Sequence, residues 1–294
     1  MLSLHTNAAS LSAQNSLSST QSKLSTSMTR LSTGFRINSA ADDAAGLQIA
    51  TRLKSQTSGM AVALRNTQNS VSMLQTAEGA LDEVTNILTR MKDLATQAAD
   101  ASSSTADQTA MQKEYDSLTD ELSNVFSNTK FGGTALLSKT GKLSAAAGIT
   151  FQIGADSSEK MVGNFSTELV TDVHANIALA ATAFKADGTA TAAAGAEVST
   201  STAANGSIDK LATAINDVSA LRSKIGAVSN RLDHVYNNLS NVSTNTQAAT
   251  GRIMDVDFAS ESAKMTSNQM LMQAGTAMLK QTNQMSSMVM SLLQ

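Results

Sequence analysis

Residues 74–98 read LQTAEGALDEVTNILTRMKDLATQA, and this stretch decides the fold. Its apolar residues form two series with seven-residue spacing: Leu74, Leu81, Leu88 and Ala95, then Ala77, Val84, Met91 and Ala98. Because an α-helix turns once about every 3.6 residues, the two series make one narrow apolar stripe, as in a coiled coil. The stretch therefore predicts a long helix that packs against another helix.

A matching stripe lies late in the chain. Its members recur every seven residues: Leu211, Val218, Ile225, Leu232 and Leu239. Between the two stripes, residues 111–125 carry a shorter helical pattern that ends before Gly132 and Gly133. We therefore expect a mainly α fold, a long antiparallel coiled coil or helical bundle. Its first long helix should start near Asp42 or Asp43, because a carboxylate suits the positive end of the helix dipole.

Two mid-chain segments lack the helical pattern. From about residue 134 to 173 glycines recur, and residues 149–153 alternate as a strand does, which predicts a small β-hairpin region packed on the bundle. Residues 175–205 are rich in Ala, Thr, Ser and Gly, which predicts a minimal outer excursion, either a mobile loop or a very small subdomain. The chain thus goes out and returns, and its two ends should lie together.

Both ends of the chain carry weaker seven-residue patterns. They consist of Leu17, Leu24 and Leu31 with Met28 interleaved, and of Leu271, Met278, Met285 and Leu292. Glycine and small polar residues interrupt both patterns, so isolated helices would be marginal in water. We expect these ends to be disordered alone and helical once packed. The Met-rich C-terminal end is interpreted as a packing stripe in an assembly rather than a peptide that docks in a groove.

Composition permits long helices and excludes several classes of protein. The 294 residues include no proline and no cysteine, and aromatic residues are 3% of the total, so methyl-bearing side chains must carry the packing. A net charge of −3 gives no electrostatic reason to expect nucleic acid or an anionic membrane as partner. No stretch reaches the roughly 20 apolar residues of a membrane span, and the N-terminus lacks a cleavable signal pattern.

The residues offer no catalytic, cofactor-binding or metal-binding constellation. His5, His174 and His234 are scattered and are interpreted as lone surface histidines. Asp42 and Asp43 would point about 100° apart on a helix, which favours a helix-start role over acid–base catalysis. The chain has no phosphate-binding glycine loop and no nucleophile elbow. We therefore expect no enzyme, no cofactor and no metal.

Several blocks of the sequence resemble bacterial flagellins. Residues 31–50, LSTGFRINSAADDAAGLQIA, look like the N-terminal signature of that family, and residues 75–83, QTAEGALDE, look like its continuation. Residues 226–231, 255–259 and 273–279 are similar to the C-terminal blocks. The blocks stand in the right order and spacing, so the chain is identified as resembling this family over its two ends, about residues 1–140 and 205–294.

The resemblance implies three domains and a function. Residues 1–45 and 255–294 would form an inner terminal coiled-coil domain, whose filament core packing would use the eight Leu and Met residues of the terminal patterns. Residues 46–174 and 206–254 would form a helical bundle plus β-hairpin, with the two long stripes as its seam. Residues 175–205 would be a small surface loop or vestigial outer domain. By resemblance, the chain is a structural subunit that self-assembles into the flagellar filament for swimming motility.

The resemblance also implies partners and a location. Subunits of this family are exported by the flagellar type III apparatus without a cleaved signal peptide, so the place of action is the extracellular flagellum. The implied partners are further copies of the chain, an export chaperone that binds the C-terminal segment, the filament cap and the hook-filament junction proteins. Toll-like receptor 5 is a further implied partner, through Arg90, Leu94 and Glu114, which match the family's contact positions.

Three alternatives remain at this point. A hook-filament junction protein is the nearest, although such proteins tend to be longer and to diverge in residues 38–46. An enzyme displayed on a filament would need histidine and glutamate ligands in mid-chain, and residues 175–205 hold only Glu197 and no histidine. A soluble immune-modulating module would not polymerise.

Overall fold

The computed structural model describes residues 8–187 and 195–292, and the side chains of these as far as residue 284. In chain order the elements are α1 (Ala8–Thr33), α2 (Ala44–Ala99), α3 (Thr105–Asn128), β1 (Lys130–Phe131), β2 (Thr134–Ala135), β3 (Ile149–Gln152), β4 (Lys160–Gly163), the π-helix η1 (Thr167–His174), α4 (Ala175–Ala180), α5 (Ser201–Met254) and α6 (Phe258–Leu292). The fold is mainly α, as predicted. The chain divides into two compact units, residues 58–243 and residues 1–57 with 244–294.

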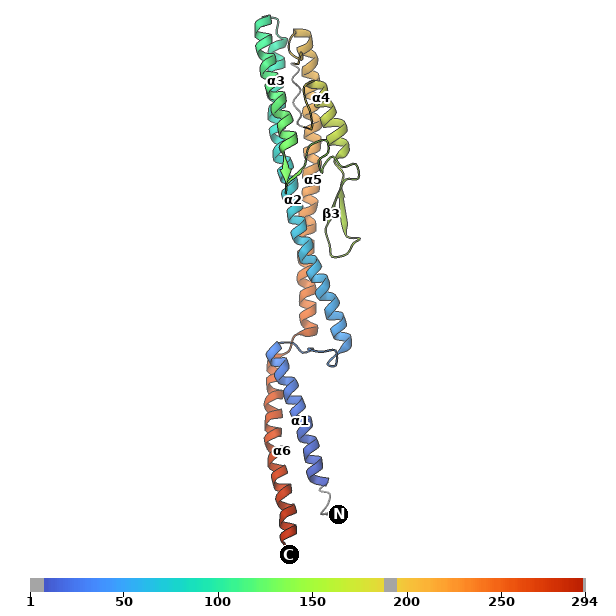
Figure 1. Ribbon diagram of the computed structural model, residues 1–294, viewed down its shortest axis with the longest axis vertical. Coiled ribbons are helices and arrows are strands. Elements are labelled where there is room, and N and C mark those ends of the chain that lie inside the picture. Colours follow the sequence, from blue (N-terminus) through green and yellow to red (C-terminus); the bar gives the residue numbers. More distant parts are fainter. Residues whose placement is uncertain (1–7, 188–194, 293–294) are drawn as a thin grey trace. The chain divides into compact units, whose positions relative to one another are not determined.

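The larger unit is a helical bundle built on the two long stripes. α2 and α5 lie side by side and run antiparallel (Figure 1). Arg222 Nη1 of α5 lies 3.0 Å from Asp82 Oδ1 of α2, and Ser201 Oγ donates to the carbonyl oxygen of Ala99 at 2.6 Å. The structure fully buries the seam residues Leu74, Leu81, Leu88, Leu211, Val218, Ile225 and Leu232. One continuous core joins them to the apolar faces of α3, η1 and α4.

α3 has clear start and stop signals. At its start, Ser104 Oγ accepts from the Asp107 amide at 3.2 Å and Asp107 Oδ2 accepts from the Ser104 amide at 3.1 Å, which satisfies two amides that a helix leaves unpaired. At its end the chain turns between β1 and β2 through Gly132 and Gly133, whose φ angles of 57° and 80° favour glycine. The predicted short helix and its glycine turn are confirmed.

The hairpin prediction is only partly right. β3 pairs with β4 in antiparallel register, with Phe151 opposite Met161, and both of these side chains are buried. The predicted strand at residues 149–153 is therefore confirmed. Residues 167–180 are helical, however, and not part of a hairpin. Their buried apolar residues recur every four positions, at Leu169, Val173 and Ile177, which suits one face of the wide η1 turn and its continuation in α4.

The prediction of a surface loop or vestigial outer domain at residues 175–205 is wrong for the part that the structure describes, and residues 188–194 lie outside it. α4 is packed on the bundle, where the Ala180 carbonyl oxygen accepts from the buried Tyr115 hydroxyl at 2.7 Å. Phe184 and Val198 belong to the same core. The sequence pattern missed this packing because most of the buried groups are single alanine methyls, which carry little periodic signal.

A carboxylate also anchors this segment to α3. Glu197 Oε1 accepts from the Thr182 amide at 2.7 Å, and its Oε2 accepts from Gln112 Nε2 at 3.0 Å. Gln112 Oε1 in turn accepts from the Val198 amide at 2.8 Å. Burial alone would raise the pKa of Glu197, but the hydrogen bonds from Thr182 and Gln112 hold it below its usual range. The two stretches that flank residues 188–194 are thus tied to each other and to one helix.

His174 is a second correction, because it is buried and not a surface residue. Its Nε2–H donates to the Leu137 carbonyl oxygen at 2.9 Å, and its ring meets the Phe126 ring edge-on with centroids 5.2 Å apart. Burial lowers the pKa of His174 to about 4; the bond to Leu137 opposes this shift and the positive charge of Lys139 adds to it. His234 is exposed as expected, and His5 lies outside the described residues.

We predict that His174 makes the bundle less stable in weak acid. Its ordinary pKa of 6.5 lies above its folded pKa, so the unfolded chain takes up the proton first as the pH falls. The free energy of unfolding should drop by roughly 2 kcal/mol between about pH 7 and about pH 5, above the range in which carboxylates titrate. Urea unfolding followed by circular dichroism at the two pH values measures the drop.

The variant His174→Gln separates this titration from the packing, because a glutamine amide can donate to Leu137 and does not titrate. The free energy of unfolding of this variant should depend less on pH, whatever its absolute stability. A His174→Gln protein with the original pH dependence would contradict the prediction.

Candidate functional site

The smaller unit holds the two ends of the chain, which pair as predicted. α1 and α6 lie side by side and antiparallel (Figure 1). Ser10 Oγ donates to Asn283 Oδ1 at 3.4 Å near one end of the pair, and Ser27 Oγ donates to Glu261 Oε1 at 2.6 Å near the other. This compact unit spans residues 1–57 and 244–294, so it also takes in the first turns of α2 and the last turns of α5. The breaks between helices lie close to the predicted domain bounds, at residues 45 and 255.

The contact between α1 and α6 is made largely by small and polar groups. The stripe of buried and half-buried positions on α1 is Ser10, Ala13, Leu17, Thr20, Leu24, Ser27 and Leu31, and on α6 it is Glu261, Met265, Asn268, Met272, Gly275, Leu279 and Thr282. Both stripes alternate steps of three and four residues, which is the coiled-coil spacing. About half of these residues are polar or lack a sizeable side chain, so the seam within one chain is weakly hydrophobic.

The predicted filament-packing residues fall into three groups. Leu24 is buried, and Leu17 and Leu31 are half-buried in the seam, where Leu17 lies against Gly275. Met28, Leu271 and Met278 are 56%, 56% and 67% exposed. Met285 and Leu292 lie beyond the residues whose side chains the structure describes.

The α6 pattern was placed one position away from the contact that forms within the chain. The seam passes through Met272 and Leu279, while Leu271 and Met278 flank it, because one residue along a helix is a turn of about 100°. Met270, which sequence analysis did not single out, is also 60% exposed. The terminal pair therefore fills about half of its seam with small and polar side chains and leaves several large apolar ones in solvent, unlike a self-sufficient helix pair.

Backbone hydrogen bonds between residues 34–36 and 254–256, here called the strap, hold the segment after α1 beside the segment before α6. Gly34 caps the C-terminal end of α1. Its amide donates to the Arg30 carbonyl oxygen at 2.9 Å, and its φ angle of 76° is the left-handed conformation of a helix cap. The chain then pairs with the segment that precedes α6. The Arg36 amide donates to the Met254 carbonyl oxygen at 2.6 Å, and the Val256 amide donates to the Gly34 carbonyl oxygen at 3.0 Å.

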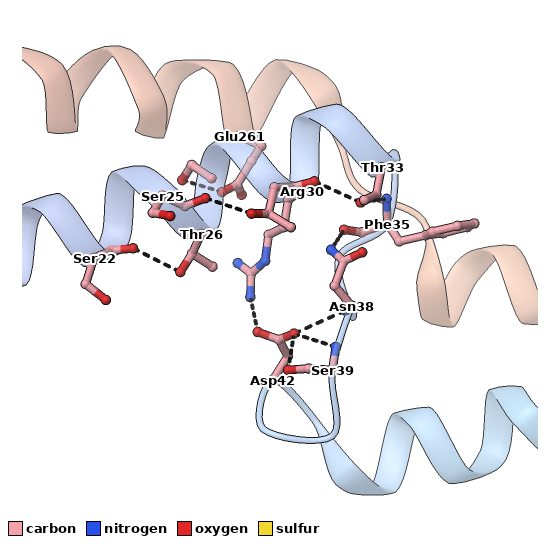
Figure 2. A network of polar contacts seen from close by, with 12 residues as sticks. Ser22, Ser25, Thr26, Arg30, Thr33, Phe35, Asn38, Ser39, Asp42 and Glu261 are labelled. Carbon is pink, nitrogen blue, oxygen red and sulfur yellow. Dashed lines mark hydrogen bonds and ion pairs between the residues drawn. The ribbon is translucent and has the colours of Figure 1, made fainter.

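Asp42 holds the loop that follows the strap. As Figure 2 shows, its Oδ2 accepts from the Asn38 amide, the Ser39 amide and the Ser39 hydroxyl, at 3.1, 2.9 and 3.0 Å. Arg30 Nη2 of α1 lies 3.7 Å from the other oxygen, Oδ1. The pKa of Asp42 is held below its usual range, first by the Ser39 amide and then by the Ser39 hydroxyl and the Asn38 amide.

Asp43 has a different task, because it starts α2. Its Oδ1 accepts from the Gly46 amide at 2.8 Å, as a helix N-cap does, so the predicted helix-start role is confirmed. A side chain at Gly46 would collide with Asp43 and with the buried Ile37, since a Cβ there would lie 2.5 and 2.8 Å from their atoms. The neighbouring carboxylates thus serve two separate pieces of local structure.

A polar cleft of about 380 Å³ lies along α1 and α6, beside the buried Glu261. Glu261 has a pKa held below its usual range, first because the Ser27 hydroxyl donates to it and then because Lys264 Nζ lies 3.4 Å away. Neither the cleft nor any other described part of the chain groups three or more histidine, aspartate or glutamate side chains suitably for a metal ion. Among the described helices, none is both long and apolar enough to cross a membrane.

The three predicted receptor-contact residues are not equally accessible. Arg90 Nε and Nη2 both donate to Glu114 Oε1, at 3.0 and 2.7 Å, and both side chains are about half exposed. Leu94 is only 2% exposed, so the structure does not place it as a surface contact. It follows the equally buried Ile87 by seven residues and so extends the apolar face of α2 under α3.

We predict that Asp42→Ala and Asp43→Ala loosen two different pieces of backbone. Asp42→Ala removes the acceptor of the Asn38 and Ser39 amides, so the hydrogen exchange of these two amides should accelerate about tenfold. Asp43→Ala should accelerate exchange at Gly46 and leave those two amides unchanged. Exchange resolved to single amides measures both. Equal effects of the two substitutions at Ser39 would contradict the assignment.

Family models and curated relatives agree on one identification. The model of the bacterial flagellin N-terminal helical region matches residues 4–142, and that of the C-terminal helical region matches residues 208–293. The chain is similar to a flagellin of Bacillus subtilis (strain 168), with 37% identity across 99% of each chain. It is also similar to flagellin B of Vibrio cholerae, with 33% identity across 99% of each chain.

A solved structure shows the same fold at lower identity. It is a putative flagellar hook-associated protein from Vibrio parahaemolyticus, with a TM-score of 0.56 and 18% identity, which covers 73% of this chain and all of that one. The hook-associated likeness concerns the fold alone, whereas the flagellin matches span both helical regions and nearly the whole sequence. Flagellins are structural proteins and not enzymes. The chain belongs to the bacterial flagellin family.

Proposed function

We propose that copies of this chain polymerise through the large apolar side chains that α1 and α6 leave exposed. As a flagellin, the chain is a subunit of the flagellar filament and acts in motility outside the cell. The observation that supports this surface as the assembly device is that Leu271, Met278 and Met28 face solvent, while small and polar groups occupy about half of the seam.

The energetics favour burial of this surface against other copies. Covering one Leu or Met side chain contributes about 1.5–3 kcal/mol, and each copy offers several on its terminal helices. The seam within one chain gains less, because Ser, Thr, Gly and Asn occupy many of its positions. The terminal helices therefore reach their full stability in the assembly and not in the single subunit.

The same weakness suits export as an unfolded chain. A terminal segment that depends on neighbours for stability costs little to keep unfolded, which favours passage through the flagellar type III apparatus. An export chaperone bound to the C-terminal segment would cover Leu271 and Met278 before assembly. Folding under the filament cap, on a base of hook-filament junction proteins, would complete the route.

We predict that Leu271→Asn prevents assembly without unfolding the subunit. The substitution removes an apolar side chain that is 56% exposed, so the helix content and melting temperature of the monomer should change little. Losing about 1.5–3 kcal/mol per copy should raise the critical concentration for growth on filament seeds tenfold or more. Electron microscopy and sedimentation of seeded reactions measure growth.

Val162→Thr is the matched control, because Val162 is equally exposed, at 56%, but lies on β4 of the bundle. This variant should grow filaments like the natural chain. Normal growth of Leu271→Asn, or an equal defect in both variants, would overturn the assignment of the terminal helices as the assembly surface.

Recognition by Toll-like receptor 5 is a second proposed activity, and one structural observation favours it. Arg90 and Glu114 form a two-bond ion pair on adjacent helices and stay about half exposed, so a partner can reach both. Leu94 would act indirectly, because its buried side chain packs α2 against α3 and so sets the distance between Arg90 and Glu114.

We predict that Arg90→Ala weakens receptor activation by monomeric subunits about tenfold, because a charge-assisted contact of roughly 1.4 kcal/mol or more is lost. Arg222→Ala, which breaks the comparable ion pair with Asp82, should have no effect. A receptor-reporter cell assay supplies the dose for half-maximal response. Equal responses to both variants would argue against this surface.

A further inference from the structure

We propose that the thioether sulfurs of Met28, Met270 and Met278 form an oxidation site for peroxides, and that sulfoxide formation there stops a subunit from joining a filament. The second half of this inference rests on the proposed polymerisation through α1 and α6. The first half, which sulfurs react, depends only on the structure of the single chain.

Exposure sorts the described methionines into sharply different classes. Met28, Met270 and Met278 of the terminal helices are 56%, 60% and 67% exposed. The methionines of the bundle core, Met60, Met73, Met91, Met111 and Met161, are between 0% and 8% exposed. Met254, Met265 and Met272 are half-buried. One chain therefore carries both the reactive sites and their internal controls.

The reaction needs nothing from the protein except access. A sulfur lone pair attacks one oxygen of hydrogen peroxide, the S–O bond forms as the O–O bond breaks, and the other oxygen leaves as water after proton transfer. The sulfur loses two electrons and the peroxide gains them. A thioether has no proton to lose and needs no activating base, so solvent access decides which methionine reacts.

The product opposes assembly at this surface. A sulfoxide is polar and accepts hydrogen bonds, so burying it against an apolar neighbour without a donor costs free energy where the thioether gains it. Met278 lies on the same stripe of α6 as Leu271, so oxidation places a polar group inside the proposed contact. A thiol-dependent sulfoxide reductase reverses the change.

Assembly itself would end the sensitivity. A subunit is open to peroxide while its terminal helices are uncovered, and neighbouring copies would shield the same sulfurs in the polymer. Oxidation thus blocks assembly at the stage of the free subunit, whereas a filament that has already formed keeps its structure in the same oxidant.

The first measurement is a map of sulfoxides by peptide mass spectrometry after millimolar peroxide treatment of the folded, full-length subunit. We expect Met28, Met270 and Met278 to oxidise at least tenfold faster than the five core methionines, with Met265 and Met272 between them. In seeded filaments the three fast sites should slow at least tenfold. Uniform rates in the free subunit, or unchanged rates in the filament, would overturn the proposal.

The second measurement is seeded growth after the same treatment. The natural chain should lose growth and regain it after reductase treatment. The triple variant Met28→Leu, Met270→Leu and Met278→Leu keeps the apolar volume without an oxidisable sulfur at these three positions, so it should grow before and after peroxide. The matched control, Met254→Leu with Met265→Leu and Met272→Leu, should remain sensitive.

Each outcome has a distinct meaning. If peroxide stops growth of the triple variant as well, the sensitive sulfur lies elsewhere and the assignment is refuted. If the natural chain still grows with its three sites oxidised, sulfoxide formation does not block assembly and the proposal is refuted. If the untreated natural chain does not grow on seeds, the polymerisation proposal fails instead, and the sulfoxide map still tests the site. Circular dichroism before peroxide treatment checks that both variants are folded.

Discussion

The antiparallel seam between α2 and α5 is the constraint on which the rest of the structure depends. Its seven-residue repeat buries leucine and valine at successive turns of two long helices, and the absence of proline lets both helices run unbroken. α3, η1 and α4 complete the core against this seam. Because the core is continuous along this seam, a change at one buried position, such as a charge on His174, lowers the stability of the whole bundle.

The terminal pair follows a different rule, although it uses the same spacing. About half of the positions at which its helices meet are small or polar, including a buried carboxylate, so the contact buries less apolar surface than a regular coiled-coil seam. Further leucine and methionine side chains, among them Leu271 and Met278, lie outside the seam. The terminal helices of such a subunit are fully covered only when neighbouring copies pack against them, and a chemical change to their exposed side chains takes place before this assembly.

The sequence predicted the strong repeats well. The seven seam residues from Leu74 to Leu88 and from Leu211 to Leu232 are buried, because large apolar side chains at regular spacing have one way to pack, while Leu239 at the end of the late stripe is half-buried. The expected filament-packing residues Leu271 and Met278 lie one position away from the contact within the chain, and their role in the filament stays a prediction. The packing of the segment around Phe184 and Val198 gave no clear pattern, because most of its buried groups are single alanine methyls. Leu94 is buried and not a surface contact, as its spacing from Ile87 already indicates. The tasks of Asp42 and Asp43 differ by a backbone geometry that residue types do not reveal.

The strap between Gly34 and Val256 and between Arg36 and Met254 has a mechanical consequence. The two connecting segments are held edge to edge by paired backbone bonds, so a pull along one of them loads those bonds together, in shear, and not one after another as in unzipping. Tension that enters through either terminal helix is thereby shared between both connections. A joint that divides a load between two segments of the chain is drawn out less easily than either segment would be without its partner.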